Sequence, residues 1–414
     1  MREEILNNLN NPKELEKLYR SSKNEFSKSF HQLYPEIKEN TAAQIWHERL
    51  SFENEAISWG SHKELIFVLA AALIAGFIAK IPDFFNIEEE YYYSRHIGFI
   101  FLPLLAVWFA WKEHLKQKQV IIIGASFIIS ALYINLLPDN NKSDSIIMAC
   151  IHLPLFLWSV TGFAFVGNDL HNNTKRLDYL RYNGDMVVLT ALIFLAGGIL
   201  SFITVGLFSI IEINIQEFYF RYIAVWGASA APVVATYLVQ INPQLVNKVS
   251  PVIAKVFTPL VFIMLVIYML ALIGSGKDPY NDREFLFFFN MLLIGVMALI
   301  FFSIAEITKN KASKFGMLLL LGLAVVTIII NGIALSAILF RISSMGITPN
   351  RFVITGGNTL ILINLFMITY GLFKALKNQH EITRVEKSIA VYLPVYVLWT
   401  MIVSFIIPLL FGFK

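Results

Sequence analysis

The polar residues that stand out in this sequence lie inside or beside long apolar stretches. Two arginines each precede an asparagine by seven residues: Arg283 with Asn290, and Arg351 with Asn358. Seven residues are about two turns of an α-helix, so each Arg–Asn pair shares a helix face, about 10 Å apart along the axis. An arginine near a helix start suits a phosphate or carboxylate ligand. These four residues are therefore a candidate anion-binding site.

The local sequence strengthens this hypothesis. Asp278–Pro279 precedes Arg283 and Thr348–Pro349 precedes Arg351, and each pair is a cap residue followed by a first-turn proline. The free N–H groups and positive dipole end of each helix would then join the arginine. Two alternatives stay open. Arginines at helix ends can extend to the membrane surface or pair with an acidic neighbour, and buried asparagines can simply hydrogen-bond between helices.

Arg341 and His152 complete the candidate ligand-binding set. Arg341 ends the apolar stretch before Arg351, and His152 lies about two turns inside another stretch. A histidine there is either a proton relay or a packed core residue. The sequence contains no H-E-x-x-H motif and no Cys/His zinc spacing, and Gly276–Lys277 lacks the other residues of a phosphate-binding loop. We therefore expect no catalytic residue, no metal site and no cofactor.

The segment Asn168–Asp185 is the most polar linker between apolar stretches. An acid–base or metal cluster could form there from Asp169, His171, Asp178, Arg181 and Asp185. The alternative is a solvated loop with a short interfacial helix from Thr174 to Arg181.

Composition indicates the elements that position these residues. Of 414 residues, 57% are hydrophobic and 15% are charged, and the mean hydropathy is +0.63. Such a chain is typical of an integral membrane protein, in which helices satisfy the backbone. We predict an all-α, polytopic transmembrane bundle of eleven spans, the second short enough to be re-entrant. Their cores are 65–81, 97–111, 120–137, 146–166, 186–210, 222–239, 252–273, 285–305, 315–340, 352–373 and 391–412.

Residues 1–64 are predicted to form a small helical domain in front of the transmembrane domain, residues 65–414. Asn11 and Pro12 open a first helix, a second is expected from Ser22 to just before Pro35, and a third carries Trp46. Three short helices make a thin core, so we expect packing against the bundle or a cytoplasmic partner protein.

Lysine and arginine counts predict the orientation. With the N-terminus in the cytoplasm, inside segments hold 24 of these residues and outside segments hold 8, which places Lys414 outside the cytoplasm. The net charge of +4 does not indicate a nucleic-acid-binding surface. The expected partner is the lipid bilayer of a bacterial inner membrane.

Residues 277–310 align with 345–378 at an offset of 68 residues, with six identities in 34 positions. The offset pairs Arg283 with Arg351 and Asn290 with Asn358. It would be a parallel repeat, which some transporters contain.

Three segments prompt a family resemblance: Arg176-Leu-Asp-Tyr-Leu-Arg-Tyr-Asn-Gly184, Asp278-Pro-Tyr-Asn-Asp-Arg283 and Gly346-Ile-Thr-Pro-Asn-Arg351. With Lys17-Leu-Tyr-Arg20 and Ala43-Gln-Ile-Trp-His47, the chain resembles an uncharacterised family of bacterial multi-pass membrane proteins over nearly its whole length. The resemblance implies an inner-membrane location and no activity.

The sequence favours a transporter, or a transport component, for a small or anionic solute. Two alternatives remain: a scaffold or sensor that recruits a cytoplasmic partner through residues 1–64, and a membrane enzyme that acts on lipid or envelope precursors. A continuous polar cavity would favour the transporter. A closed, dry bundle would favour the scaffold, and a lateral opening beside acid–base residues would favour the enzyme.

Overall fold

The computed structural model describes residues 1–53, 60–140, 142–210, 213–243, 249–275, 280, 283–309, 314–378 and 381–414. The described residues are almost entirely helical and form two units, Met1–Gly60 and Ser61–Lys414.

The described residues of the N-terminal unit form four helices around their own core. They are α1 (Arg2–Asn7), α2 (Pro12–Ser21), α3 (Lys23–Ile37) and α4 (Thr41–Glu53). Asn11 caps α2 by accepting a hydrogen bond from the Glu14 N–H, as its sequence predicts. Helix α3 continues past Pro35 to Ile37, so the predicted stop is wrong; only the last turn lies beyond the proline, where the lost hydrogen bond costs least.

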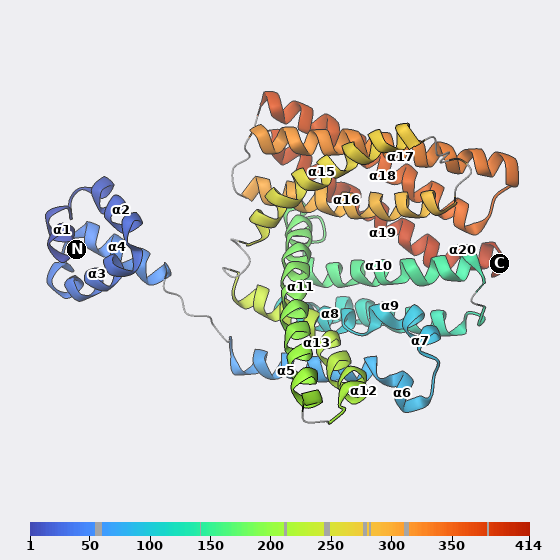
Figure 1. Ribbon diagram of the computed structural model, residues 1–414, viewed down its shortest axis with the longest axis horizontal. Helices are drawn as coiled ribbons and strands as arrows, with labels where there is room; N and C mark the ends of the chain where they lie inside the picture. Colours follow the sequence, from blue (N-terminus) through green and yellow to red (C-terminus); the bar gives the residue numbers. More distant parts are fainter. Residues whose placement is uncertain are drawn as a thin grey trace. The chain divides into compact units, whose positions relative to one another are not determined.

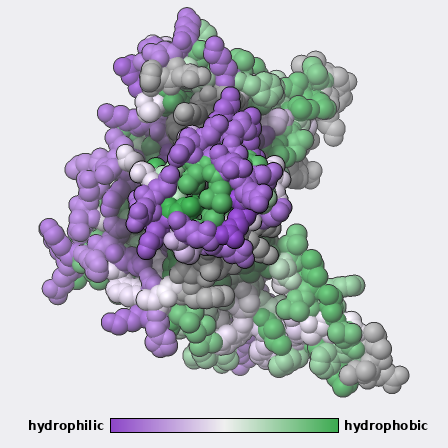
Figure 2. Space-filling view, turned by 90° about the vertical axis from the view of Figure 1, so that its left-hand side faces the viewer, coloured by the Kyte–Doolittle hydropathy of each residue, from purple (hydrophilic) through white to green (hydrophobic). Residues whose placement is uncertain are grey.

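The core of this unit is aromatic. Phe26 and Phe30 are fully buried, and Trp46 packs its ring 5.1 Å from that of Phe26. Leu6 and Ile45 remain exposed. In Figure 2 a hydrophobic patch on this unit is surrounded by hydrophilic residues.

The second unit is a bundle of long apolar helices (Figure 1). Ten helical segments among the described residues are long and apolar enough to cross a membrane, and the 27-residue α15 is an eleventh apolar helix. Every predicted span therefore coincides with a helix, and the all-α polytopic fold is confirmed. The helical elements are α5 (His62–Ala79), α6 (Ile81–Phe85), α7 (Glu89–His96), η1 (Ile97–Phe99), α8 (Leu102–Lys112), α9 (Gln117–Leu136), α10 (Asp144–Val166), α11 (Asn173–Ile210), α12 (Gln216–Phe218), η2 (Tyr219–Ala224), α13 (Val225–Ile241), α15 (Val249–Ser275), α16 (Arg283–Lys309), α17 (Lys314–Met345), α18 (Pro349–Lys377), α19 (Ile382–Met401), η4 (Ile402–Ile406) and α20 (Ile407–Leu410).

The bundle has two ends, which we call the Glu64 end and the Lys414 end. At the first, Lys112 of α8 pairs with Glu64 of α5, which also closes a capping box with Ser61. At the second, the Ser145 N–H of α10 donates to the Lys414 carbonyl oxygen at 2.9 Å.

The predicted short second span runs the full length of its neighbour. Glu64 at the start of α5 meets Lys112 at the end of α8, and the Tyr93 hydroxyl of α7 donates to the Ala79 carbonyl at the end of α5. The segment α7–η1–α8 therefore lies antiparallel to all of α5. Its apolar core is short because the α7 half carries tyrosines and charged residues instead of aliphatic ones.

Helix α11 differs from the other long helices. It crosses them in Figure 1 and contacts α10, α13, α16 and α19. Its first turns lie between the two large cores, one built from α5 to α13 and the other from α15 to α19. Its most apolar stretch has only 11% of its residues buried, the lowest share among the ten candidate spans. Thr190 and Phe194, near the middle of α11, line a cleft.

Candidate functional site

An open cleft of about 900 Å³ lies between α5, the α7–η1–α8 segment, α11 and the η2–α13 segment. That volume is typical of a ligand pocket. Most of its wall is apolar, and its charged residues come from α5, α7, α12 and η2. The lining residues are Ala79, Lys80, Glu89, Tyr93, Ile97, Ile100, Phe101, Thr190, Phe194, Gln216, Glu217, Phe220, Arg221, Val225, Ala228, Ser229 and Pro232.

An ion cluster lies at the Lys414 end of this cleft. Lys80, only 2% exposed, pairs with Asp83. Arg221 reaches the same carboxylate, with Nε at 2.8 Å and Nη2 at 2.6 Å from Oδ1. A hydrogen bond from Lys80 has the largest effect on the pKa of Asp83 and, with a second from Arg221, holds it below its usual value. The carboxylate is therefore charged at neutral pH.

The chain turn after α5 places these residues together. Lys80 ends the apolar run of α5, and the short helix α6 starts at the next residue, with Pro82 in its first turn. This turn brings Asp83 back to the Lys80 ammonium three residues earlier. The Lys80 Nζ also lies 4.9 Å from the centre of the Tyr222 ring, so a buried cation has two compensating partners.

A π-helical segment positions Arg221. Residues Tyr219–Ala224 form η2, which continues α12 and leads into α13. Phe220 and Arg221 of η2 both line the cleft. Short π-helical segments inside α-helices occur often at functional sites, which supports this cleft as a candidate site.

Part of the cleft wall is both apolar and exposed. Ile97, Phe194 and Phe220 line the cleft and are each about half exposed, at 51%, 50% and 48%. All three lie on segments that are long and apolar enough to cross a membrane. Exposed apolar side chains on such segments are typical of a lipid-facing surface, so this part of the cleft suits an apolar ligand.

The structure brings the predicted asparagines together. Asn358 Nδ2 donates to Asn290 Oδ1 at 2.9 Å, and Asn331 Nδ2 donates to the Asn358 carbonyl oxygen at 3.0 Å. Asn331 and Asn358 are buried, between α16, α17 and α18. The two asparagines that the repeat pairs thus bond directly to each other, as helix–helix contacts do.

The other predicted ligand-binding residues do not line the cleft. Arg351 Nη1 donates to the carbonyl oxygens of Met345 and Gly346, and Arg341 Nε donates to that of Tyr280. The His152 ring contacts the Met148 carbonyl oxygen, one turn earlier in α10. The side chain of Arg283 lies outside the described residues. Anion binding by these arginines stays a prediction.

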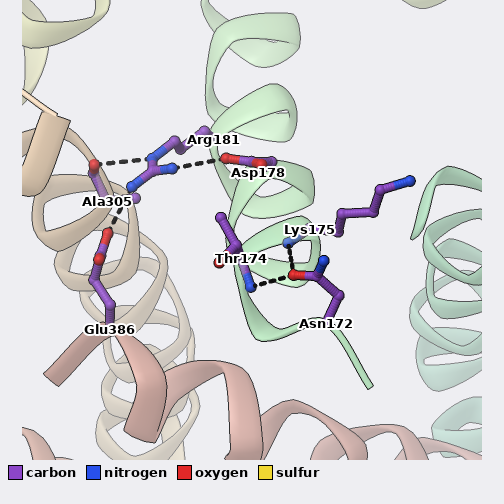
Figure 3. A network of polar contacts seen from close by, with 7 residues as sticks. All are labelled: Asn172, Thr174, Lys175, Asp178, Arg181, Ala305 and Glu386. Atoms are coloured by element: carbon purple, nitrogen blue, oxygen red, sulfur yellow. Dashed lines mark hydrogen bonds and ion pairs between the residues drawn. The ribbon is translucent and has the colours of Figure 1, made fainter. Parts of the chain in front are cut away.

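The polar linker 168–185 proves to be mostly the start of α11 (Figure 3). The Asn172 side chain accepts hydrogen bonds from the N–H groups of Thr174 and Lys175 and so caps this helix. Arg181 lies between three elements: it pairs with Asp178 at 2.7 Å and Glu386 at 2.6 Å, and Nε donates to the Ala305 carbonyl oxygen. Within the described part of the chain, no three His, Cys, Asp or Glu residues could jointly hold a metal ion.

Other residues of the 176–184 motif also join helices. The Tyr179 hydroxyl donates to the Trp158 carbonyl oxygen, Asn183 accepts from Trp158 Nε1, and Tyr182 bonds to Thr236. The motif is therefore the junction between α10, α11, α13, α16 and α19.

Fold and cleft together define a multi-pass helical membrane protein with an open, mainly apolar cleft. No protein-family model matches the chain, and the comparisons with curated proteins and with solved structures give no match either.

Proposed function

We propose that this protein takes a lipid-like amphiphile from the bilayer into the cleft, as a transport protein or as a component of one. The observation that carries the proposal is a cleft of about 900 Å³ that combines a mostly apolar wall with charged residues. An amphiphile needs both surfaces: apolar burial of its chains and ionic partners for its head group.

A lipid-like ligand fits the cavities better than a small soluble solute does. A second cavity of about 550 Å³ lies on the other face of the α7–η1–α8 segment, and its lining is mainly apolar too. Neither cavity offers the continuous polar wall that a hydrated solute requires. The separate core and exposed Leu6 and Ile45 of the N-terminal unit favour a second role, docking of a cytoplasmic partner.

Filling the cleft should expel the ligand. Ala228 lines the cleft and is exposed, so a tryptophan there enters the cleft without entering the core. We expect A228W to lower the lipid retained after detergent purification at least about threefold, measured by native mass spectrometry. L132W is the matched control, because Leu132 is an exposed apolar residue of α9 outside the cleft. If A228W retains as much lipid as L132W does, the proposal is wrong.

The orientation is part of the proposal, and the lysine and arginine distribution supports it. With the Glu64 end in the cytoplasm, the charged end of the cleft lies at the opposite membrane surface. Reporter fusions after Lys118 should then report cytoplasm, and fusions after Asp139 and Lys414 should report the other side. A cytoplasmic signal at Lys414 would contradict this orientation.

A further inference from the structure

The charges around the cleft specify a head group. We infer that the cleft binds an aminophospholipid, a lipid whose head group joins a phosphodiester anion to a primary ammonium. This inference rests on the proposed lipid-binding function and adds the identity of the head group.

Arg221 supplies the contact for the phosphodiester. Its Nε and Nη2 are engaged by one oxygen of Asp83, which fixes the plane of the guanidinium. No described residue accepts a hydrogen bond from its Nη1, and the side chain is 51% exposed at the cleft. A guanidinium held on one edge by a carboxylate presents its other edge to an anion, with the Lys80 ammonium behind it.

Glu89 and Glu217 supply the contact for the ammonium. Both line the same end of the cleft, and neither forms an ion pair with a described residue. Glu217 is close enough for its charge to act on Arg221. An ammonium four or five bonds from a phosphodiester could therefore meet a carboxylate while the phosphodiester meets Arg221.

The charge balance decides between head groups. Lys80 and Arg221 carry two positive charges, and Asp83, Glu89 and Glu217 carry three negative ones. Glu88 and Glu90 are exposed beside Glu89 and make the rim more acidic still. A purely anionic head group would bring further negative charge to this rim, whereas a zwitterion matches both signs. A primary ammonium can also donate hydrogen bonds to the carboxylates, which a quaternary one cannot.

The test uses the full-length protein in bilayers of equal parts phosphatidylethanolamine, phosphatidylglycerol and phosphatidylcholine with identical acyl chains. After extraction into detergent, native mass spectrometry counts each retained lipid. We expect phosphatidylethanolamine to exceed each of the others by about threefold, the scale of one partly exposed ion pair. The double variant E89Q/E217Q should reduce this ratio to about one at unchanged total lipid. R221Q should lower retention of all three phospholipids.

Two variants at the same end control for a general change in surface charge. D144N and K142Q lie outside the cleft and should leave the ratio and the total unchanged. Equal or stronger retention of phosphatidylglycerol or phosphatidylcholine overturns the inference, and so does a ratio that survives E89Q/E217Q. In each of those cases the A228W result still decides separately whether the cleft binds lipid at all.

Discussion

Replacing Arg181 with methionine is expected to cause the largest loss of stability among single substitutions at the junction of α11. The change removes the ion pairs with Asp178 and Glu386 and the hydrogen bond to the Ala305 carbonyl oxygen. The Arg181 and Glu386 side chains are 19% and 13% exposed, so solvent replaces these contacts poorly. Breaking a buried pair from one side costs about 3–5 kcal/mol, and partial exposure lowers this to about 2–3 kcal/mol.

Thermal unfolding of the detergent-solubilised protein measures this effect. R384M is the matched control, because Arg384 pairs with Glu381 on the same helix but is 74% exposed. A pair of that kind contributes about 0–1 kcal/mol, so R384M should lower the midpoint far less than R181M does. Equal midpoints for the two variants would show that the network in Figure 3 contributes little to stability.

A valine at position 162 is expected to be the second strongly destabilising change. A Cβ on Gly162 would lie 2.6 Å from Cε1 of Tyr179. That ring cannot move freely, because its hydroxyl donates to the Trp158 carbonyl oxygen and its faces contact the rings of Trp158 and Phe165. Overpacking of this kind costs about 1–3 kcal/mol, and the two extra methyl groups of valine put the expected cost at the upper end.

The matched control for this change is G124V in α9. Nothing lies within 4 Å of a Cβ built on Gly124, so valine there should be neutral or slightly stabilising, since glycine is a poor helix former. Unfolding midpoints of G162V and G124V in the same detergent test the contrast. Similar midpoints would mean that α10 and α11 can separate at this contact without loss of stability.

Hydrophobicity and capping allowed the fold class to be predicted. Runs of apolar residues reveal spans because lipid leaves the backbone no partner but itself, and Asn11 and Thr348 act as caps at the positions that their sequence indicates. The direction of α11 could not be predicted, since hydropathy measures the length of a span and contains no information on how it packs.

The residues of the cleft were harder to predict than the helices. Lys80 and Arg221 stand at the ends of apolar stretches in the sequence, but their common partner, Asp83, is 138 residues from Arg221 in the chain. One signal was available in the sequence: a lysine at the end of an apolar run is stabilised by a nearby acid, and Asp83 is three residues away. The asparagine pair Asn290–Asn358 was found because the repeat offset of 68 residues relates the two positions.

The π-helical turn of η2 makes the charged end of the cleft sensitive to the number of residues in the chain. A π-helical turn contains one residue more than an α-helical turn, so η2 amounts to a single-residue insertion in the helix that becomes α13. Losing that residue would restore a regular α-helix and rotate Arg221 by about 100° relative to α13. All the charged side chains of the cleft could be retained, and the guanidinium would still leave Asp83. Between diverging copies of this gene, a one-codon gap within residues 219–224 would therefore matter more to the cleft than most substitutions there.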